Sequence, residues 1–598
     1  MKLKKLSIRK SMLEQFVYIF WVVSAFVISA TVSPISHSYG MNVRIVSILC
    51  FLISLFWLCL FIFEKYKNDP LIFEYLKRNK YEIIVLLIAI FLRAIQLGTK
   101  PKWDSEFYFN SLVAGCENFD FSLRSFIEAF RLCAHPTIMY AAITSIGYFL
   151  IPGDIVGVQI INLILSIVAI HFVYQILKVI AAGIHERVIA FATLVFSLAP
   201  MFLGTFSTYT PDFGVAVFFI FVLYFHLTKK YVLMFFYSVC LILTKEIGII
   251  LLAGYYSAYC ILILFFTSGS CKDKFRKVVT DKTFLYGLCS GLFGVIYYIY
   301  SMFFSDFSNW KFSFGTEEAG VVQDTTQMVS NFIYNFSYII TKLKTLVILN
   351  FSWILFILLL ISCSVIIKRK LLKRILIYKE MISICGSMIF FCVFTFLYIT
   401  YNNSRYHLVY ELCLFLLSLS VIIKLFGKRK EILFLLIGLC FIFGLEAYTT
   451  VDPLTKIFFD RIETGSRLAM VTTNWEGHSG VKADVTVYNH QFTYLDKAYD
   501  AILEKEYSSD KDIIVWGPYS ETKAVAIEGI EGKFVWNFKD NKRECVANEN
   551  TEEFNIVYEE EFEEMLKNDQ LNEEAILICT PQFGNYVEAA KEVLSNYY

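Results

Sequence analysis

The sequence predicts a polytopic α-helical membrane protein with a small α/β domain at its C-terminal end. Of its 598 residues, 57% are hydrophobic and only 18% are charged. The mean hydropathy of +0.58 is far too high for a soluble globular protein. Apolar stretches of roughly twenty residues recur along the chain, and each can cross a hydrocarbon core of about 30 Å as a helix. The chain carries no strongly basic patch, so nucleic acid is not an expected partner.

These stretches predict about thirteen membrane crossings. The expected spans are residues 12–31, 42–63, 81–98, 154–178, 187–203, 211–228, 231–243, 248–267, 283–304, 346–367, 381–400, 406–424 and 431–449.

Basic residues give these spans an orientation. Under this assignment the clusters all fall on one face of the membrane, which the positive-inside rule makes cytoplasmic. They are Lys2, Lys4, Lys5 and Arg9; Lys77, Arg78 and Lys80; Lys229 and Lys230; Lys272, Lys274, Arg276 and Lys277; Lys368, Arg369, Lys370, Lys373 and Arg374; and Lys428, Arg429 and Lys430. We therefore expect a multi-pass cell-membrane protein with a cytoplasmic N-terminus and an extracytoplasmic C-terminal domain.

Three regions follow along the chain. Residues 1–80 hold two N-terminal spans and a cytoplasmic loop, residues 81–450 form the main membrane module, and residues 451–598 form the outer domain. The module contains one long outer loop, 99–153. Its apolar segment 136–151 is nearly long enough to cross, but a crossing there would turn the later basic loops outward. We expect this segment to lie along the outer interface or to dip into it.

The outer domain is predicted from a change of composition near Thr450, after which acids outnumber bases and the apolar runs become short. Runs at 512–517, 533–538, 555–558 and 575–580 indicate strands. Stretches at 495–507 and 585–597 have a helical pattern. Strands that alternate with helices are typical of an α/β domain.

Asp104 and Glu106 are the most informative polar residues, because they follow the span 81–98 directly. An ionised carboxylate drawn into hydrocarbon costs on the order of 3 kcal/mol or more, so acids at a membrane surface are solvated, paired or functional. In a loop or an extended strand, both acids could face one pocket, whereas on a helix they would point apart.

Other polar residues lie at outer helix ends under the same topology. They are His135, Asp212, Lys245, Glu246, Arg405, Tyr406 and His407. Each has a structural alternative: Asp212 suits a helix cap, Lys245 and Glu246 can neutralise each other, and Arg405 and His407 can anchor a helix among headgroups. Taken together, they suit a reaction in which an acid removes a proton from an acceptor while Lys245 and Arg405 stabilise a phosphate leaving group.

The order of these motifs resembles the GT-C membrane glycosyltransferases, and within them the protein O-mannosyltransferase and aminoarabinose transferase group. The resemblance covers residues 81–425 and rests on the acids after an early span, then His135-Pro136, Thr210-Pro211-Asp212, Thr244-Lys245-Glu246 and Ser404-Arg405-Tyr406-His407.

The resemblance implies sugar transfer from a polyprenyl-phosphate-linked donor to a glycan, lipid or protein acceptor at the outer face. It also implies that the acid of the first outer loop is the catalytic base. The family motif is an adjacent Asp-Glu, whereas here Ser105 separates the two acids. The base is therefore Asp104 or Glu106. The resemblance implies no certain cofactor, because family members differ in their need for a metal, and the pair could alternatively bind a divalent cation such as Mg²⁺ or Mn²⁺ through oxygen ligands.

The leading hypothesis is therefore a glycosyltransferase of the GT-C type, a hexosyl- or pentosyltransferase of a bacterial cell membrane that acts in envelope assembly. One alternative is a transporter or flippase for lipid-linked sugars, which would bind its substrate near the bilayer midplane between internal repeats. Another is a receptor or assembly protein whose acidic outer domain binds a partner.

Overall fold

The computed structural model describes residues 77–98, 104–117, 138–303, 339–370, 379–398 and 404–448, seven strands between 461 and 579, and a few single residues between these segments. The two predicted N-terminal spans, 12–31 and 42–63, lie outside the described residues, as do the expected helices at 495–507 and 585–597. The account below concerns the helical region, which carries the candidate site.

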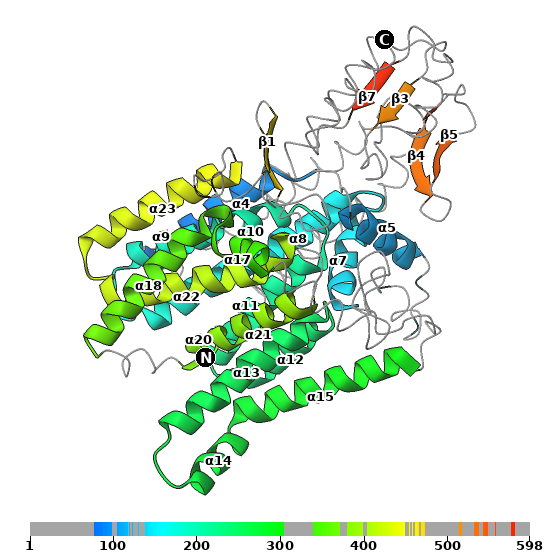
Figure 1. Cartoon of the computed structure of the whole chain (residues 1–598). Coiled ribbons are helices and arrows are strands. Elements are labelled where there is room, and N and C mark those ends of the chain that lie inside the picture. The colour runs from blue at the N-terminus through cyan, green and yellow to red at the C-terminus, as the bar shows by residue number, and fades with distance from the viewer. Residues whose placement is uncertain are drawn as a thin grey trace, which may run out of the picture.

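Helices form nearly all of the described membrane module (Figure 1). They are α4 (Lys80–Ala94), α5 (Asp104–Glu117), α7 (Met139–Leu150), α8 (Ile155–Ile180), α9 (Glu186–Ser197), α10 (Pro200–Thr205), α11 (Pro211–Leu227), α12 (Tyr231–Ile242), α13 (Ile247–Phe266), α14 (Cys271–Val279), α15 (Lys282–Phe303), α17 (Ile339–Val347), the 3₁₀ turn η2 (Leu349–Phe351), α18 (Ser352–Lys368), α20 (Lys379–Ile382), α21 (Ile384–Tyr398), the 3₁₀ turn η3 (Ser404–His407), α22 (Leu408–Phe426) and α23 (Lys430–Tyr448).

Six of the described helical segments are long and apolar enough to cross a membrane, and α7, α11 and α12 are shorter apolar helices. Every expected span from 81–98 onward contains helix. The expected span 187–203 is not one continuous helix, because the chain breaks between α9 and α10. Pro200 opens α10 and lacks the N–H that would continue the hydrogen-bond ladder of α9. The total of thirteen crossings stays a prediction.

The helical region has two ends that differ in composition. The end that we call inner holds the helix junctions with clustered basic residues. There, Lys424 at the end of α22 donates to the Ile180 carbonyl at the end of α8 over 2.9 Å. Lys282 at the start of α15 lies over the Tyr231 ring at the start of α12. In Figure 1, α14 lies at this inner end and α5 at the opposite, outer end. The placement of the inner end in the cytoplasm stays a prediction.

Helix α7 forms a hairpin with α8. The Tyr140 hydroxyl bonds Asn162, and Gly147 meets Gly157, so α7 and α8 run antiparallel. A Cβ on Gly147 would lie 2.1 Å from the Gly157 carbonyl oxygen, so only glycine permits this approach. The N–H groups of Ile138 and Met139 both donate to the Leu243 carbonyl at the end of α12. Helix α7 thus packs into the bundle against α8 and the end of α12, and the placement of segment 136–151 at the outer interface stays a prediction.

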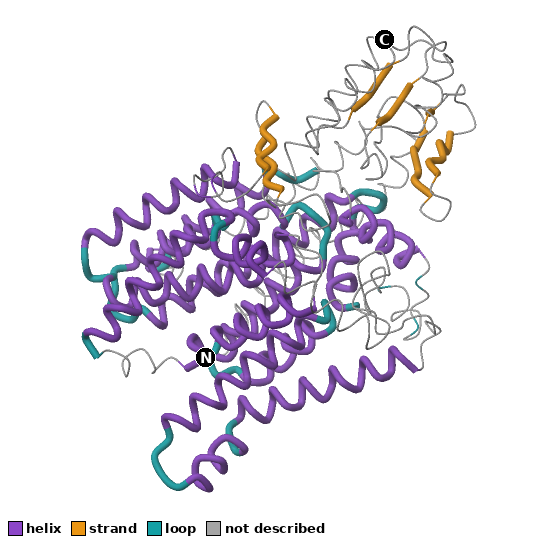
Figure 2. The backbone as a smooth tube through the Cα atoms, viewed as in Figure 1, coloured by secondary structure: helices purple, strands orange, loops and turns teal. Residues whose placement is uncertain are grey.

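Within the described residues, strands occur only in the C-terminal region (Figure 2). They are β1 (Arg461–Gly465), β2 (Leu468–Thr472), β3 (Ile513–Trp516), β4 (Gly532–Asn537), β5 (Lys542–Ala547), β6 (Ile556–Val557) and β7 (Ile576–Cys579). Three of them form a parallel sheet in the order β6-β3-β7, while β1-β2 and β4-β5 are antiparallel pairs. Strands lie in all four expected runs, but the α/β domain as a whole stays a prediction.

Candidate functional site

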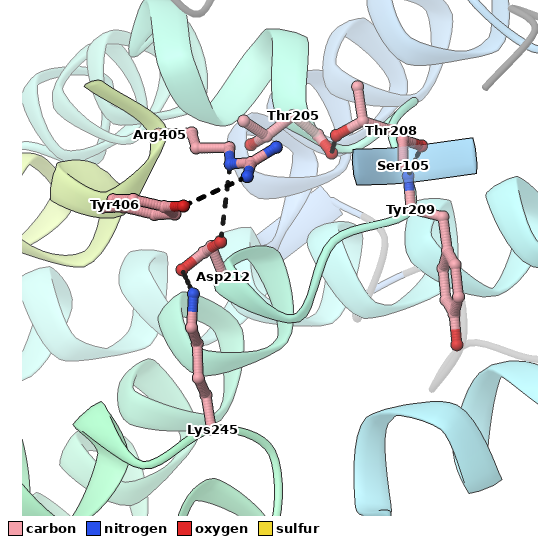
Figure 3. Close-up of polar contacts among 8 residues, drawn as sticks. All are labelled: Ser105, Thr205, Thr208, Tyr209, Asp212, Lys245, Arg405 and Tyr406. Carbon is pink, nitrogen blue, oxygen red and sulfur yellow. Dashed lines mark hydrogen bonds and ion pairs between the residues drawn. The ribbon is translucent and has the colours of Figure 1, made fainter. Parts of the chain in front are cut away.

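Asp212 is the centre of a buried polar cluster at the outer end of the bundle (Figure 3). Lys245 donates from Nζ to Asp212 Oδ1 over 2.7 Å, and Arg405 Nε lies 3.9 Å from Asp212 Oδ2. The side chains of Asp212, Arg405 and Lys245 are 7%, 5% and 13% exposed. Three residues far apart in sequence thus form one buried ionic group.

Local sequence explains why these residues lie at helix ends. Thr210 is extended and precedes Pro211, whose fixed φ suits the first position of α11. Asp212 then lies in the first turn, where the helix dipole favours a negative charge. Lys245 lies in the short junction between α12 and α13.

Tyr406 holds the two cations on one aromatic ring. Lys245 Nζ lies 4.6 Å from the ring centroid and Arg405 Cζ lies 5.2 Å from it. The Arg405 Nη2 also donates to the Tyr406 hydroxyl at 3.5 Å, near the limit for a hydrogen bond. The ring faces attract both charges, which keeps two like charges close together.

The two cations of this cluster offer N–H donors to an anionic ligand. Burial lowers the pKa of the Lys245 ammonium, but the charges of Asp212, Tyr406 and Glu246 and the hydrogen bond to Asp212 together outweigh that effect, so the pKa is raised and Lys245 is protonated at neutral pH. Arginine is always charged. Charged N–H donors of this kind suit a phosphate group.

The segment that leads into Asp212 is fixed by amide side chains of α8. Gln159 donates to the Ser207 carbonyl over 2.8 Å, and Asn162 donates to the Phe206 carbonyl over 3.1 Å. The Tyr140 hydroxyl in turn donates to Asn162 over 2.9 Å. Because buried amides are costly unless bonded, these contacts hold the 206–210 segment in one conformation.

Aromatic packing supports the same segment from α7. The rings of Tyr140 and Tyr209 stack with centroids 5.2 Å apart, and the Tyr209 hydroxyl lies 3.0 Å from that of Thr144. A Cβ on Gly214 would meet the Tyr140 ring at 2.7 Å and Thr244 at 3.0 Å. Glycine at this position therefore lets α7 and the α12–α13 junction pack closely against the first turns of α11.

Ser105 connects the first outer loop to the cluster. The Tyr209 N–H donates to the Ser105 Oγ over 2.7 Å, and Ser105 is 2% exposed (Figure 3). Since Ser105 lies between Asp104 and Glu106, this bond holds the first turn of α5 against the segment that leads to Asp212. Of the conformations left open for the acids, the structure has the helix, because α5 begins at Asp104. The side chains of Asp104 and Glu106 themselves lie outside the described residues.

The remaining predicted residues are less central. Glu246 is half-buried at the N-cap of α13, next to Lys245. His407 is buried, and its ring meets Phe391 edge-on with centroids 5.8 Å apart. His135 lies outside the described residues. The structure thus brings together Asp212, Lys245, Arg405 and Tyr406 of the predicted set.

Sequence reasoning missed the residues that position this cluster. Ser105 was read as an interruption of the acidic pair, and Gln159 and Asn162 as part of an apolar span. A signal for the amides was present, since they lie three residues apart on one face of α8 in a run of hydrophobic residues. Polar side chains in such a position usually face the bundle interior.

A divalent cation does not fit the Asp212 cluster. The Lys245 ammonium lies 2.7 Å from one carboxylate oxygen, the place that a metal ion would take. In the described part of the chain, no group of three or more His, Cys, Asp or Glu side chains could hold a metal ion. The binding of a divalent cation by Asp104 and Glu106 stays a prediction, because their side chains lie outside the described residues.

A scan against models of protein families finds no match, and neither does a search of curated protein sequences. Solved structures do match. ArnT from Cupriavidus metallidurans bound to undecaprenyl phosphate has a TM-score of 0.42 and 11% identity, over 74% of this chain and 84% of that one. The oligosaccharyltransferase AglB from Archaeoglobus fulgidus, in complex with an inhibitory peptide and a dolichol-phosphate, has a TM-score of 0.38 and 10% identity, over 74% and 63%.

Another structure of the Archaeoglobus fulgidus oligosaccharyltransferase, complexed with Zn and sulfate, has a TM-score of 0.37 and 11% identity over 73% of this chain and 60% of that one. The chain thus spans less than two thirds of the archaeal enzyme. The structures that this chain resembles are GT-C glycosyltransferases, the superfamily that the order of motifs resembles. Each TM-score is below 0.5, so the function is argued from the site itself.

Proposed function

We propose that the protein is a membrane glycosyltransferase of the GT-C type, which moves a sugar from a polyprenyl-phosphate-linked donor to a glycan, lipid or protein acceptor. The observation that carries this proposal is the Ser105–Tyr209 bond. It joins the helix that begins with Asp104 and Glu106 to the cluster that contains Lys245 and Arg405. The proposed base and the proposed phosphate site then lie in the same region of the molecule.

The reaction divides between these two parts. The carboxylate of Asp104 or Glu106 accepts the proton of the acceptor group as that group attacks the anomeric carbon. The bond between the anomeric carbon and the phosphate oxygen breaks, and the lipid phosphate leaves with an added negative charge. Lys245 and Arg405 neutralise that charge. Since the sugar and proton are both transferred without redox change, no further reactant is needed.

The predicted topology suits such a donor. The site lies at the end of the bundle opposite the basic junctions, and the positive-inside rule assigns that end to the outer face. A lipid-linked donor can enter there sideways from the bilayer while an acceptor approaches from outside. We propose the outer face of a bacterial cell membrane as the site of transfer, with the C-terminal region on the same side.

The test is a transfer assay with the full-length protein in nanodiscs and a panel of radiolabelled undecaprenyl-phosphate sugars, with delipidated envelope extract as the acceptor source. Wild-type protein should release undecaprenyl phosphate and label the extract. Either Asp104→Asn or Glu106→Gln should abolish most of both signals. Full activity in both folded variants would refute the proposed base. Donor movement across a vesicle membrane without sugar transfer would favour the transporter alternative.

A further inference from the structure

Two buried oxygen atoms at the start of α11 have no hydrogen-bond partner among the described residues. One is Asp212 Oδ2, and the other is the Thr210 hydroxyl. Thr210 is fully buried and makes no capping bond to α11, although it occupies the N-cap position. A buried polar atom left unbonded costs about 1–3 kcal/mol, so two of them within three residues of one helix start call for an explanation.

The geometry around Asp212 shows which group could bond to it. Its Oδ1 is taken by Lys245, whereas its Oδ2 lies 3.9 Å from Arg405 Nε, beyond hydrogen-bond distance. One oxygen atom could lie within about 2.8 Å of both atoms, accepting from the arginine N–H and donating to the carboxylate. The bridging group must therefore be donor and acceptor at once.

A hydroxyl group satisfies this requirement, as does a water molecule that such a hydroxyl would displace, whereas a phosphate, a carboxylate and an ammonium group do not. A phosphate or carboxylate oxygen has no proton to give at neutral pH, so Asp212 repels it. An ammonium group can donate to Oδ2 but meets the positive charges of Lys245 and Arg405. A hydroxyl both donates and accepts, and the Thr210 hydroxyl offers it a further partner two residues away.

We propose that Asp212 and Thr210 form a subsite that binds a hydroxyl group of the transferred sugar, on the ring carbon next to the anomeric carbon. The proposal rests on the function proposed above, in which Lys245 and Arg405 bind the donor phosphate. Because Arg405 faces both the phosphate and Asp212, the recognised hydroxyl lies within a few ångströms of that phosphate. The hydroxyl on the carbon next to the anomeric carbon is separated from the phosphate oxygen by the fewest bonds, so we assign it to this subsite. In this arrangement Asp212 bonds the sugar hydroxyl, while Lys245 and Arg405 bond the phosphate.

The inference predicts opposite effects on two lipids. Undecaprenyl phosphate has no sugar, and its binding to Asp212→Asn or Thr210→Val should be unchanged or tighter than to wild type. The undecaprenyl-phosphate sugar that wild type binds best should bind these variants about tenfold to hundredfold more weakly, the loss expected for a site that bonds a substrate hydroxyl. Thr210→Val keeps the size and shape of the side chain, so it tests the subsite without removing a charge.

The experiment measures equilibrium binding of both lipids, and of the 2-deoxy counterpart of the sugar donor, to the full-length protein in nanodiscs. Wild type should prefer the parent donor to the 2-deoxy donor, and both variants should lose most of that preference. Equal binding of the two donors to wild type, or an unchanged preference in Thr210→Val, overturns the subsite while leaving the phosphate site standing. If wild type binds neither undecaprenyl phosphate nor any sugar donor, the proposed function fails and the subsite with it.

Discussion

The buried polar clusters around Glu82 and His226 differ from the cluster around Asp212 in how fully their groups are bonded. At the inner end, Glu82 of α4 accepts from His171 at 2.5 Å and from Gln175 at 3.0 Å on both oxygens. His226 uses both ring nitrogens, on Tyr255 and Thr283. At the outer end, Asp212 Oδ2 and the Thr210 hydroxyl have no such partner among the described residues.

Under the proposed function, that difference separates the structural polar groups from those that bind substrate. A satisfied network stabilises the packing of the helices that it joins. An arrangement that holds two cations on one ring and leaves acceptor and donor atoms unbonded is stabilised further when a ligand completes it. The inner clusters are therefore the natural controls for the outer one, and each prediction below compares a change at the site with a matched change elsewhere.

The largest effect is expected at the acids of α5. Replacing the base, whether Asp104→Asn or Glu106→Gln, should lower the transfer rate by about 10²- to 10⁴-fold, the usual contribution of a general base. The other acid should matter less. Parallel kinetics of the two variants and of Glu82→Gln would identify the base. If Glu82→Gln lost as much activity as the two site variants, the division between the ends would be wrong.

Lys245→Gln should give the next largest effect. Losing one charge-assisted hydrogen bond to the donor phosphate costs about 1.5–3 kcal/mol, or about 10- to 150-fold in kcat/KM. Lys424→Gln is the matched control, since Lys424 is also partly buried but bonds a backbone carbonyl at the inner end. Titrating both variants with the donor would measure the loss in kcat/KM. Equal losses in the two variants would argue against a phosphate role for Lys245.

Ser105→Ala tests the connection between the two parts of the site. The loss of one hydrogen bond, about 1 kcal/mol, should lower kcat about fivefold while the affinity for undecaprenyl phosphate stays unchanged. Ser105→Thr retains a hydroxyl and should recover much of the rate. Ser362→Ala, which removes a bond only within α18, serves as the control. A drop in lipid affinity equal to the drop in rate would mean that Ser105 acts on the fold instead.

Glu82→Gln should have the smallest effect on activity and a measurable one on stability. The change weakens the bonds to His171 and Gln175 that join α4 to α8, at a cost of about 1 kcal/mol. Thermal unfolding in detergent should show a lower midpoint, and the folded fraction should transfer sugar at the wild-type rate.

Hydropathy predicted where most helices lie, because a stretch of about twenty apolar residues has few other stable states beside a bilayer. It predicted less well where helices break, as at Pro200. Of the candidate site, Asp212, Lys245, Arg405 and Tyr406 could be predicted from residue type and sidedness. The bond between Ser105 and Tyr209, and the bonds from Gln159 and Asn162, could not, because they join residues more than forty positions apart and depend on how the helices pack.

The measurement that tests the central claim most directly is the affinity of full-length protein in nanodiscs for undecaprenyl phosphate. Wild type and Lys424→Gln should bind equally well. The double variant Lys245→Gln, Arg405→Gln should bind at least about a hundredfold more weakly, because it removes both donors to the phosphate. Equal binding by wild type and the folded double variant would contradict the assignment of Lys245 and Arg405 as the phosphate site.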